Sequence, residues 1–310
     1  MSFQKIDYAQ LFDLTVDFAF KSFFGSRDTK KLISLLNAIF ARKAIPRVIT
    51  RLTISSPETR KTDKDDKLSI LDIRAILTDN TQLCIEMHMY NLSEFKLKSI
   101  RNWARIYGEY LNAGDSYLEQ KPAICVSFID GAINDVNGAS LDKIHSLFYI
   151  SERDDHNVLT HDLELHYINM KAFVKALLED NCNGVLSNKD GFTKWLTLIT
   201  LNKISDKSIL EKVCGEDAEM EQAVEDLVKI SQKKINRQAY QKRLDELRAY
   251  NAMVQKIAEQ GTVIAEQGTV IAEQGTVIAE QNVQLNDMKA QIVALQEKNA
   301  KLLAQKKQNK

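Results

Sequence analysis

The sequence has little proline and glycine, few tryptophans and no excess of either charge. It contains 3 Pro, 11 Gly and 2 Trp in 310 residues, and its 42 Lys and Arg balance 42 Asp and Glu. This composition excludes a collagen-like or disordered chain and predicts one or two folded domains. A net charge of zero also excludes a uniformly basic surface. Any contact with nucleic acid must therefore come from a local patch or a bound metal.

Long apolar runs and closely spaced cysteine pairs of the CxxC type are absent as well. No run approaches the ~18 residues that a membrane-spanning helix needs, and the N-terminus lacks the apolar segment of a signal peptide. We therefore expect a cytoplasmic protein without membrane contact. The four cysteines show no CxxC spacing, and two of them lie inside apolar runs (Cys84, Cys125, Cys182 and Cys214). We expect them to be reduced core residues and no zinc site.

Helix-like and strand-like runs alternate through the first part of the chain. Asp13 is placed to cap a short helix that ends at Gly25, and a second helix follows Asp28. Another helix is expected from about residue 93 to 111, with its buried stripe at Ile100, Trp103, Ala104, Tyr107 and Tyr110. Strands are expected at 48–54, 68–77, 82–89, 123–129, 145–150 and 163–168. The pattern predicts an α/β fold with a mixed sheet flanked by helices.

The rest of the chain reads as helical, and its last part repeats every seven residues. Residues 171–250 contain no proline and predict a helical subdomain after an α/β core at 1–170. In residues 251–310 the heptad IAEQGTV recurs, and apolar residues occupy position a of the predicted coiled coil: Ile257, Ile264, Ile271, Ile278, Leu285 and Ile292. Within the repeats Gln takes position d and Gly position e, which weakens the seam. We expect this segment to form a homo-oligomer.

Two acidic residues on neighbouring strands form the candidate metal site. In the strand at 82–89, Glu86 and His88 alternate onto one face. If Thr78, Asp79 and Asn80 make a three-residue hairpin loop, the strand register places Asp72 directly opposite Glu86. Two adjacent carboxylates repel each other unless a cation lies between them. Such an oxygen pair suits Mg²⁺ or Mn²⁺, which can hold a phosphate oxygen and lower the pKa of an attacking water.

A simpler interpretation of the same pattern stays open. Asp72 could pair with Arg74 or Lys67 at the edge of the sheet, with Glu86 facing solvent. Periodicity alone does not decide between this arrangement and a metal site.

Several blocks of the sequence resemble a known family in their order and spacing. These are VDFAFKSFFG, LLNAIF, DDKLSILDIRA, IEMH and the WARIYGEYL helix with GDSYL and KPAICVSFID after it. They resemble the PD-(D/E)xK nuclease family transposases, also called the recombination-promoting nuclease family, over about residues 13–172. The resemblance implies a restriction-endonuclease-like core that cleaves DNA with a divalent metal. It also places Asp72 and Glu86 on the family's two metal-binding acidic positions.

The residue two positions beyond the second acid departs from the family pattern. Many nucleases of the superfamily carry Lys there and this subgroup usually carries Gln, whereas this chain has His88. A neutral imidazole can orient or deprotonate the attacking water, or ligate the metal. It does not supply the fixed positive charge of Lys. The substitution could therefore tune catalysis or abolish it.

Two further groups of residues are candidates beside Asp72, Glu86 and His88. Asp17 and Lys21 match an N-terminal DxxFK-like block, either as an accessory to the site or as a surface pair one helical turn apart. Lys98, Arg101 and Arg105 recur at i, i+3 and i+7 and could grip DNA phosphates or simply form an exposed helix flank.

The sequence thus predicts a metal-dependent DNA endonuclease that acts in recombination or transposition-like mobility. In this interpretation Asp72, Glu86 and His88 form the catalytic group. The alternative is a catalytically silent DNA- or protein-binding module whose coiled coil drives assembly.

Overall fold

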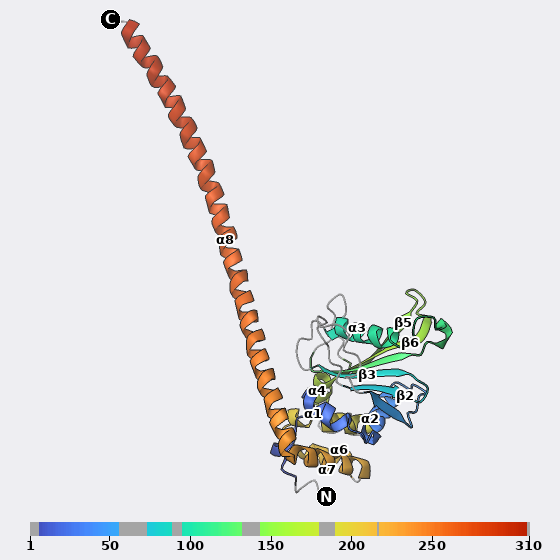
Figure 1. Ribbon diagram of the computed structural model, residues 1–310. Coiled ribbons are helices and arrows are strands. Elements are labelled where there is room, and N and C mark those ends of the chain that lie inside the picture. Colours follow the sequence, from blue (N-terminus) through green and yellow to red (C-terminus); the bar gives the residue numbers. More distant parts are fainter. Residues whose placement is uncertain are drawn as a thin grey trace. The chain divides into compact units, whose positions relative to one another are not determined.

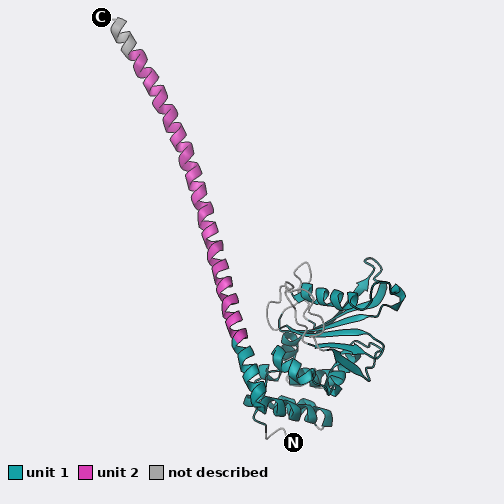
Figure 2. Cartoon of the chain, in the orientation of Figure 1, with its two compact units in different colours: residues 1–245 teal, residues 246–310 magenta. Residues whose placement is uncertain are grey.

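A computed structural model describes residues 6–55, 73–88, 95–131, 143–179, 190–215 and 217–308 (Figure 1). Contacts divide the chain into two compact units, residues 1–245 and residues 246–310 (Figure 2). The first unit contains the sheet and most of the helices. The second contains the heptad repeats.

The first unit is built on one mixed six-stranded sheet, as the sequence predicts. The strand order is β1-β2-β3-β4-β6-β5. Neighbours pair antiparallel from β1 to β3, parallel from β3 through β4 to β6, and antiparallel between β6 and β5. The strands are β1 (Leu52–Ser55), β2 (Ile73–Leu77), β3 (Gln82–His88), β4 (Ala123–Ile129), β5 (His145–Ser151) and β6 (Val158–Asn169). Every residue of β3 and β4 is buried, because these two strands lie inside the sheet with helices on both faces.

The hairpin between β2 and β3 has the predicted odd loop. The backbone N–H of Leu77 donates to the carbonyl of Thr81 at 3.0 Å, which leaves three residues in the loop. Asn80 adopts the left-handed conformation, with φ of 66°, which Asn tolerates better than most residues. The resulting register pairs Ile73 with Ile85. This register is the one on which the prediction for Asp72 and Glu86 depends.

Helices cover both faces of the sheet (Figure 1). Helix α3 (Phe95–Gly108) lies on one face, and α1 (Asp17–Phe24) and α2 (Lys30–Arg42) lie on the other. The apolar spacing predicted for α1 and α2 is confirmed, since these residues are all buried: Val16, Phe20, Phe23, Phe24, Leu32, Leu35, Leu36, Ile39 and Phe40.

Several details differ from the prediction, among them the start of strand β6, which lies at Val158 rather than at residue 163. Asp13 does not cap α1. Its carboxylate accepts hydrogen bonds from the backbone and the hydroxyl of Thr15 in the preceding turn. Strand β1 begins at Leu52 rather than at Val48, whose side chain is exposed. The strand predicted from the sequence at 48–54 therefore began four residues too early.

The chain then continues through helices, two of which contact α2. Trp195 donates its indole N–H to the hydroxyl of Ser34 at 3.0 Å, and Lys31 pairs with Asp226 at 2.8 Å. The helices are α4 (Met170–Glu179), α5 (Gly191–Ile199), α6 (Ser208–Cys214) and α7 (Ala218–Gln232), with short 3₁₀ turns at Tyr8–Gln10, Tyr117–Glu119 and Leu201–Lys203. The helical character predicted for this region is confirmed. A boundary between domains near residue 170 stays a prediction.

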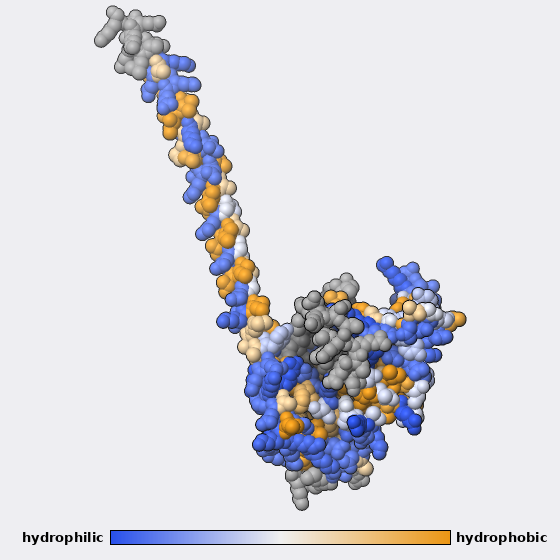
Figure 3. All heavy atoms as spheres, in the orientation of Figure 1, coloured by the Kyte–Doolittle hydropathy of each residue, from blue (hydrophilic) through white to orange (hydrophobic). Residues whose placement is uncertain are grey.

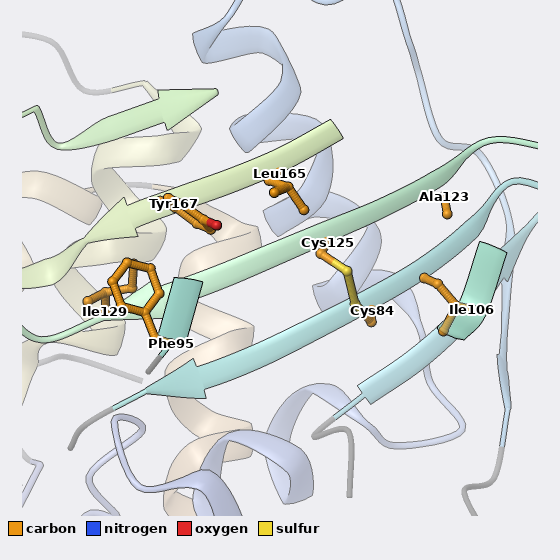
Figure 4. Packing of buried hydrophobic residues seen from close by; sticks show 8 residues of the cluster. All are labelled: Cys84, Phe95, Ile106, Ala123, Cys125, Ile129, Leu165 and Tyr167. Atoms are coloured by element: carbon orange, nitrogen blue, oxygen red, sulfur yellow. A yellow bond between two sulfur atoms is a disulfide. The ribbon is translucent and has the colours of Figure 1, made fainter. Parts of the chain in front are cut away.

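The expectation of reduced cysteines is wrong for one pair. Cys84 of β3 and Cys125 of β4 form a disulfide, with their Cα atoms 4.8 Å apart. They occupy the same register position on paired parallel strands, so both sulfur atoms point to the face that α3 covers (Figure 4). Cys214 is a buried free thiol, and Cys182 lies outside the described residues.

The second unit continues α8 (Lys234–Gln308), which begins in the first unit. All six predicted a positions are exposed, from 45% at Leu285 to 68% at Ile271. Figure 3 shows hydrophobic patches recurring along this helix. The seam is therefore uncovered in a single chain. Among the described residues, no helix is long and apolar enough to cross a membrane.

Candidate active site

Glu86 lies near the end of β3, in the interior of the first unit. It is only 3% exposed. Its neighbour on the parallel strand β4 is Ser127. Glu86 therefore faces the core below α3, so the part of the alternative interpretation that places Glu86 facing solvent is wrong. A carboxylate this deeply buried requires compensating partners.

Three side chains approach the Glu86 carboxylate. Asn102 of α3 donates its amide N–H to Oε1. His88 Nε2 lies 3.1 Å from Oε2, and Lys98 Nζ lies 3.6 Å from the same oxygen. Glu86 and His88 thus share one face of β3, as strand alternation predicts.

One oxygen and one nitrogen of this group remain without a hydrogen bond. Although Glu86 Oε2 and His88 Nε2 lie 3.1 Å apart, they do not have the angular geometry of a hydrogen bond, and neither buried atom has another hydrogen-bond partner among the described residues. Orphaned buried polar atoms are rare and require an explanation, such as an absent ion. A carboxylate oxygen and a neutral imidazole nitrogen are both suitable ligands for a divalent cation.

The buried face of α3 differs from the predicted one. Ile100 and Ala104 are exposed, and Trp103, Tyr107 and Tyr110 are only partly buried. The helix instead buries Phe95, Ser99, Asn102 and Ile106. Two of these are polar, so the inward face did not stand out as an apolar stripe in the sequence.

Each polar residue on this face has a specific partner. The Ser99 hydroxyl is hydrogen-bonded to the Tyr167 hydroxyl at 2.6 Å, and Asn102 holds Glu86. Trp103 and Tyr107 form the flank of the helix that contacts Asp162. Asn102 is thus a residue of the candidate site that the sequence analysis missed. Its position two turns after Phe95 and one turn before Ile106, both apolar and buried, was the available signal.

Polar side chains also continue from Glu86 across the sheet. Register pairs Glu86 with Ser127, Ser127 with Tyr167, and Tyr167 with Ser146. The hydroxyls of Ser127 and Ser146 are buried and have no hydrogen-bond partner among the described residues. A polar row therefore runs beneath α3 from the candidate site, beside a cluster that is otherwise apolar. Of this row, Figure 4 shows Tyr167, which lies within the cluster.

The basic flank of α3 lies on the same side of the helix as the candidate site. Lys98, Arg101 and Arg105 share this flank with Glu109, since the spacing is i, i+3, i+7 and i+11. Glu109 pairs with Arg74 of β2 at 2.6 Å, and Lys98 approaches Glu86 of β3. The flank therefore faces the β2–β3 hairpin. Lys98 is 43% exposed and Arg101 is exposed, whereas Arg105 is partly buried.

Asp17 and Lys21 do not pair with each other. The Asp17 carboxylate accepts hydrogen bonds from two nitrogens of Arg243 at the base of α8, at 2.8 and 3.0 Å from Nε and at 2.5 Å from Nη2. Lys21 is exposed. Helix α1 packs on the face of the sheet opposite α3, where Phe20 contacts Phe128 with ring centroids 5.3 Å apart. No described contact joins Asp17 or Lys21 to Glu86.

Asp72, the first predicted metal ligand, lies outside the described residues. Within the part of the chain that the structure describes, no group of three or more His, Cys, Asp or Glu side chains is arranged to hold a metal. Glu86 and His88 are thus the described part of the candidate site.

A second buried polar group lies on the opposite face of the sheet. Arg47 makes a forked contact with Glu164, at 3.3 and 3.1 Å. His166 Nε2 lies 3.3 Å from Glu164, and His166 Nδ1 lies 3.0 Å from His145 Nε2. Burial, with the neighbouring His166, lowers the pKa of His145 to about 2, and burial also lowers the pKa of His166. Both imidazoles are therefore neutral at pH 7.

The family comparison agrees with this fold. The protein is of the α/β class: it has a six-stranded mixed sheet, and strand β3 of the β2–β3 hairpin carries the buried Glu86 of the candidate metal site. The family model of the PD-(D/E)XK nuclease family transposases matches residues 14–256, and the chain belongs to this family. The match extends beyond the resemblance at 13–172 and includes the helices that pack on α2. No curated protein and no solved structure matches the chain.

Proposed function

We propose that this protein is a divalent-metal-dependent DNA endonuclease that acts in recombination or transposition-like mobility. Membership of the PD-(D/E)XK nuclease family transposases supports a nuclease role in transposition. The observation that carries the proposal is the buried Glu86 carboxylate, whose Oε2 has no hydrogen-bond partner among the described residues. A bound cation would satisfy this oxygen.

Asp72 and Glu86 would hold the metal, with His88 beside them. The β2–β3 register pairs Ile73 with Ile85. Continued by one residue, the same register would place Asp72 opposite Glu86. Nucleases of this family typically use a divalent metal, and Mg²⁺ or Mn²⁺ fits a pair of carboxylates. When bound, such an ion polarises the phosphate and acidifies a water molecule.

His88 would position the attacking water or accept its proton. Its ring is buried, and its Nε2 lies 3.1 Å from Glu86 Oε2, so the imidazole is held at the carboxylate. A neutral imidazole can accept a proton at this nitrogen. The side chain would thus act as a base without carrying a permanent charge.

The DNA backbone would bind along the basic flank of α3. Lys98, Arg101 and Arg105 line this flank, and the Arg74–Glu109 ion pair fixes it beside the β2–β3 hairpin. Phosphates bound there would pass close to Glu86. Such contacts position the duplex without reading its sequence.

The exposed heptad seam would join two or more copies of the chain. Apolar side chains at successive a positions are uncovered in the single chain, and coiled coils bury such residues against a second helix. A paired nuclease could cut both strands of a duplex. We therefore propose a homo-oligomer that binds DNA.

A plasmid-nicking assay tests the proposed activity. We expect the parent protein to nick supercoiled DNA with Mg²⁺ or Mn²⁺, and we expect this cleavage to stop when EDTA is added. Glu86→Gln and Asp72→Asn should each lower the rate by about a hundredfold or more, because each removes a ligand charge at the reacting centre. Glu179→Gln, at an exposed position on α4, is the matched control and should keep the parent rate.

Two results would contradict the proposal. Equal cleavage by the parent and both acidic variants would show that the site does not carry the activity. Metal-independent DNA binding by a parent that never cleaves would favour the catalytically silent module.

A further inference from the structure

We propose that Lys98 is the counter-ion of Glu86 in the metal-free protein. A divalent metal that binds Glu86 displaces the Lys98 ammonium, and this ammonium then binds the phosphate of the substrate. This inference rests on the proposed function, since it assumes that Glu86 binds a metal. It assigns Lys98 two successive partners. In the metal-free protein the partner is the Glu86 carboxylate, and in the metal-bound protein it is the substrate phosphate.

The contact between Lys98 and Glu86 has the geometry of a loose electrostatic pair. The ammonium lies 3.6 Å from Oε2, beyond ordinary hydrogen-bond distance. It reaches the same oxygen that lacks a hydrogen bond among the described residues. Oε1, by contrast, is held by Asn102. Oε1 is therefore held by a hydrogen bond, whereas Oε2 has the Lys98 ammonium and the His88 ring nearby but no hydrogen bond among the described residues.

Exposure shows the direction from which Lys98 arrives. The Lys98 side chain is 43% exposed, whereas the Glu86 side chain is 4% exposed. The ammonium therefore reaches the carboxylate from the solvent side, on the basic flank that faces the β2–β3 hairpin. A flexible four-carbon stem allows it to turn outward without moving the helix.

A dication and the Lys98 ammonium cannot share Oε2 at close range. Like charges only a few ångström apart repel strongly in a partly buried site. Metal binding would therefore release Lys98 into the space where substrate phosphates are proposed to lie.

Metal binding in the absence of DNA tests the displacement directly. Mn²⁺ is titrated into the full chain by calorimetry at mildly alkaline pH, for the parent, Lys98→Gln and Lys98→Arg. We expect Lys98→Gln to bind Mn²⁺ about three- to tenfold more tightly, because a competing cation has been removed. Lys98→Arg should stay within about twofold of the parent. Lys96→Gln removes the same charge from the same helix and should leave the affinity unchanged.

Cleavage at saturating Mn²⁺ supplies the second measurement. Lys98→Gln should cleave about tenfold more slowly or worse although it binds the metal more tightly, and Lys98→Arg should recover most of the rate. A merely structural role would lower both affinity and rate. Thermal unfolding checks that each variant is folded, and Lys98→Met replaces Lys98→Gln if the latter is not.

The outcomes separate this inference from the proposed function. If the parent binds Mn²⁺ and Lys98→Gln binds it equally or less tightly, the displacement is overturned while the nuclease assignment stands. If the parent neither binds Mn²⁺ nor cleaves, the proposed function fails, and the inference fails with it.

Discussion

Asn102 donates a hydrogen bond to Oε1 of Glu86 and thereby joins helix α3 to strand β3 inside the core. Both side chains are almost fully buried, at 1% and 3% exposure. Asn102→Ala should lower the free energy of unfolding by about 1–3 kcal/mol, because it leaves a buried carboxylate oxygen unsatisfied. Urea denaturation followed by circular dichroism measures this change.

The control for this prediction is Asn286→Ala, at an exposed position on α8. It should change the free energy of unfolding by no more than about 0.5 kcal/mol. A loss in the Asn102 variant equal to that of the control would show that the hydrogen bond contributes nothing. Asn102→Asp should be more damaging than Asn102→Ala at neutral pH, since it places a second carboxylate beside Glu86.

The buried pair of His145 and His166 predicts that stability falls in mild acid. Burial lowers the pKa of both imidazoles in the folded protein, to about 2 for His145. In the unfolded chain a histidine titrates near pH 6.5. The unfolded state therefore binds more protons below that pH. The contribution to stability is complete above about pH 6.5 and is lost progressively as the pH falls.

Urea unfolding between about pH 7.5 and 5 measures this dependence. Each proton taken up on unfolding contributes up to about 1.4 kcal/mol per pH unit. His145→Phe, which keeps the stacking on Phe192, should flatten the slope. His156→Asn is the control, because residue 156 is exposed in a turn with φ of 57°. A slope that stays the same in His145→Phe would contradict the prediction.

Local patterns in the sequence were enough to predict the β2–β3 hairpin and the common face of Glu86 and His88. Both follow from the parity of a three-residue loop and from alternation along a strand. The buried face of α3 could not be predicted in the same way. Ser99 and Asn102 are polar and turn inward because Tyr167 and Glu86 supply partners.

Contacts between distant parts of the chain were the other limit. The disulfide requires β3 to lie beside β4, although Cys84 and Cys125 are 41 residues apart. The Asp17–Arg243 pair joins residues 226 apart. From the sequence alone, Lys21 was a plausible ion-pair partner for Asp17, because it follows one helical turn later. Only the folding of the first unit, which includes the start of α8 up to residue 245, revealed the alternative.

The Asp17–Arg243 pair is predicted to anchor the base of α8 rather than to act in cleavage. The two side chains are 29% and 37% exposed, so solvent screens their attraction. A double-mutant cycle with Asp17→Asn and Arg243→Gln should give a coupling energy of about 0.5–1 kcal/mol in thermal or urea unfolding. Cleavage at saturating metal should remain within about threefold of the parent for Arg243→Gln.

Lys175→Gln and Glu179→Gln form the control cycle, because this exposed pair lies 3.8 Å apart on α4. Its coupling should be at most a few tenths of a kcal/mol. A loss of cleavage in Arg243→Gln as large as that in Glu86→Gln would instead place the ion pair in the catalytic machinery. That result would support an accessory role for Asp17.

The heptads of α8 are predicted to assemble the protein through residues that follow the repeats. Leu285 and Ile292 occupy successive a positions, with Met288 at the d position between them, and all three side chains are exposed in the single chain. Leu285→Glu combined with Ile292→Glu should reduce the mass measured by light scattering to that of one chain, 35.3 kDa, because charges in the seam prevent its burial. Ala290→Glu, at the outward f position, should leave the oligomer intact. An unchanged mass in the double variant, or a parent that is already monomeric, would show that this seam does not join copies of the chain.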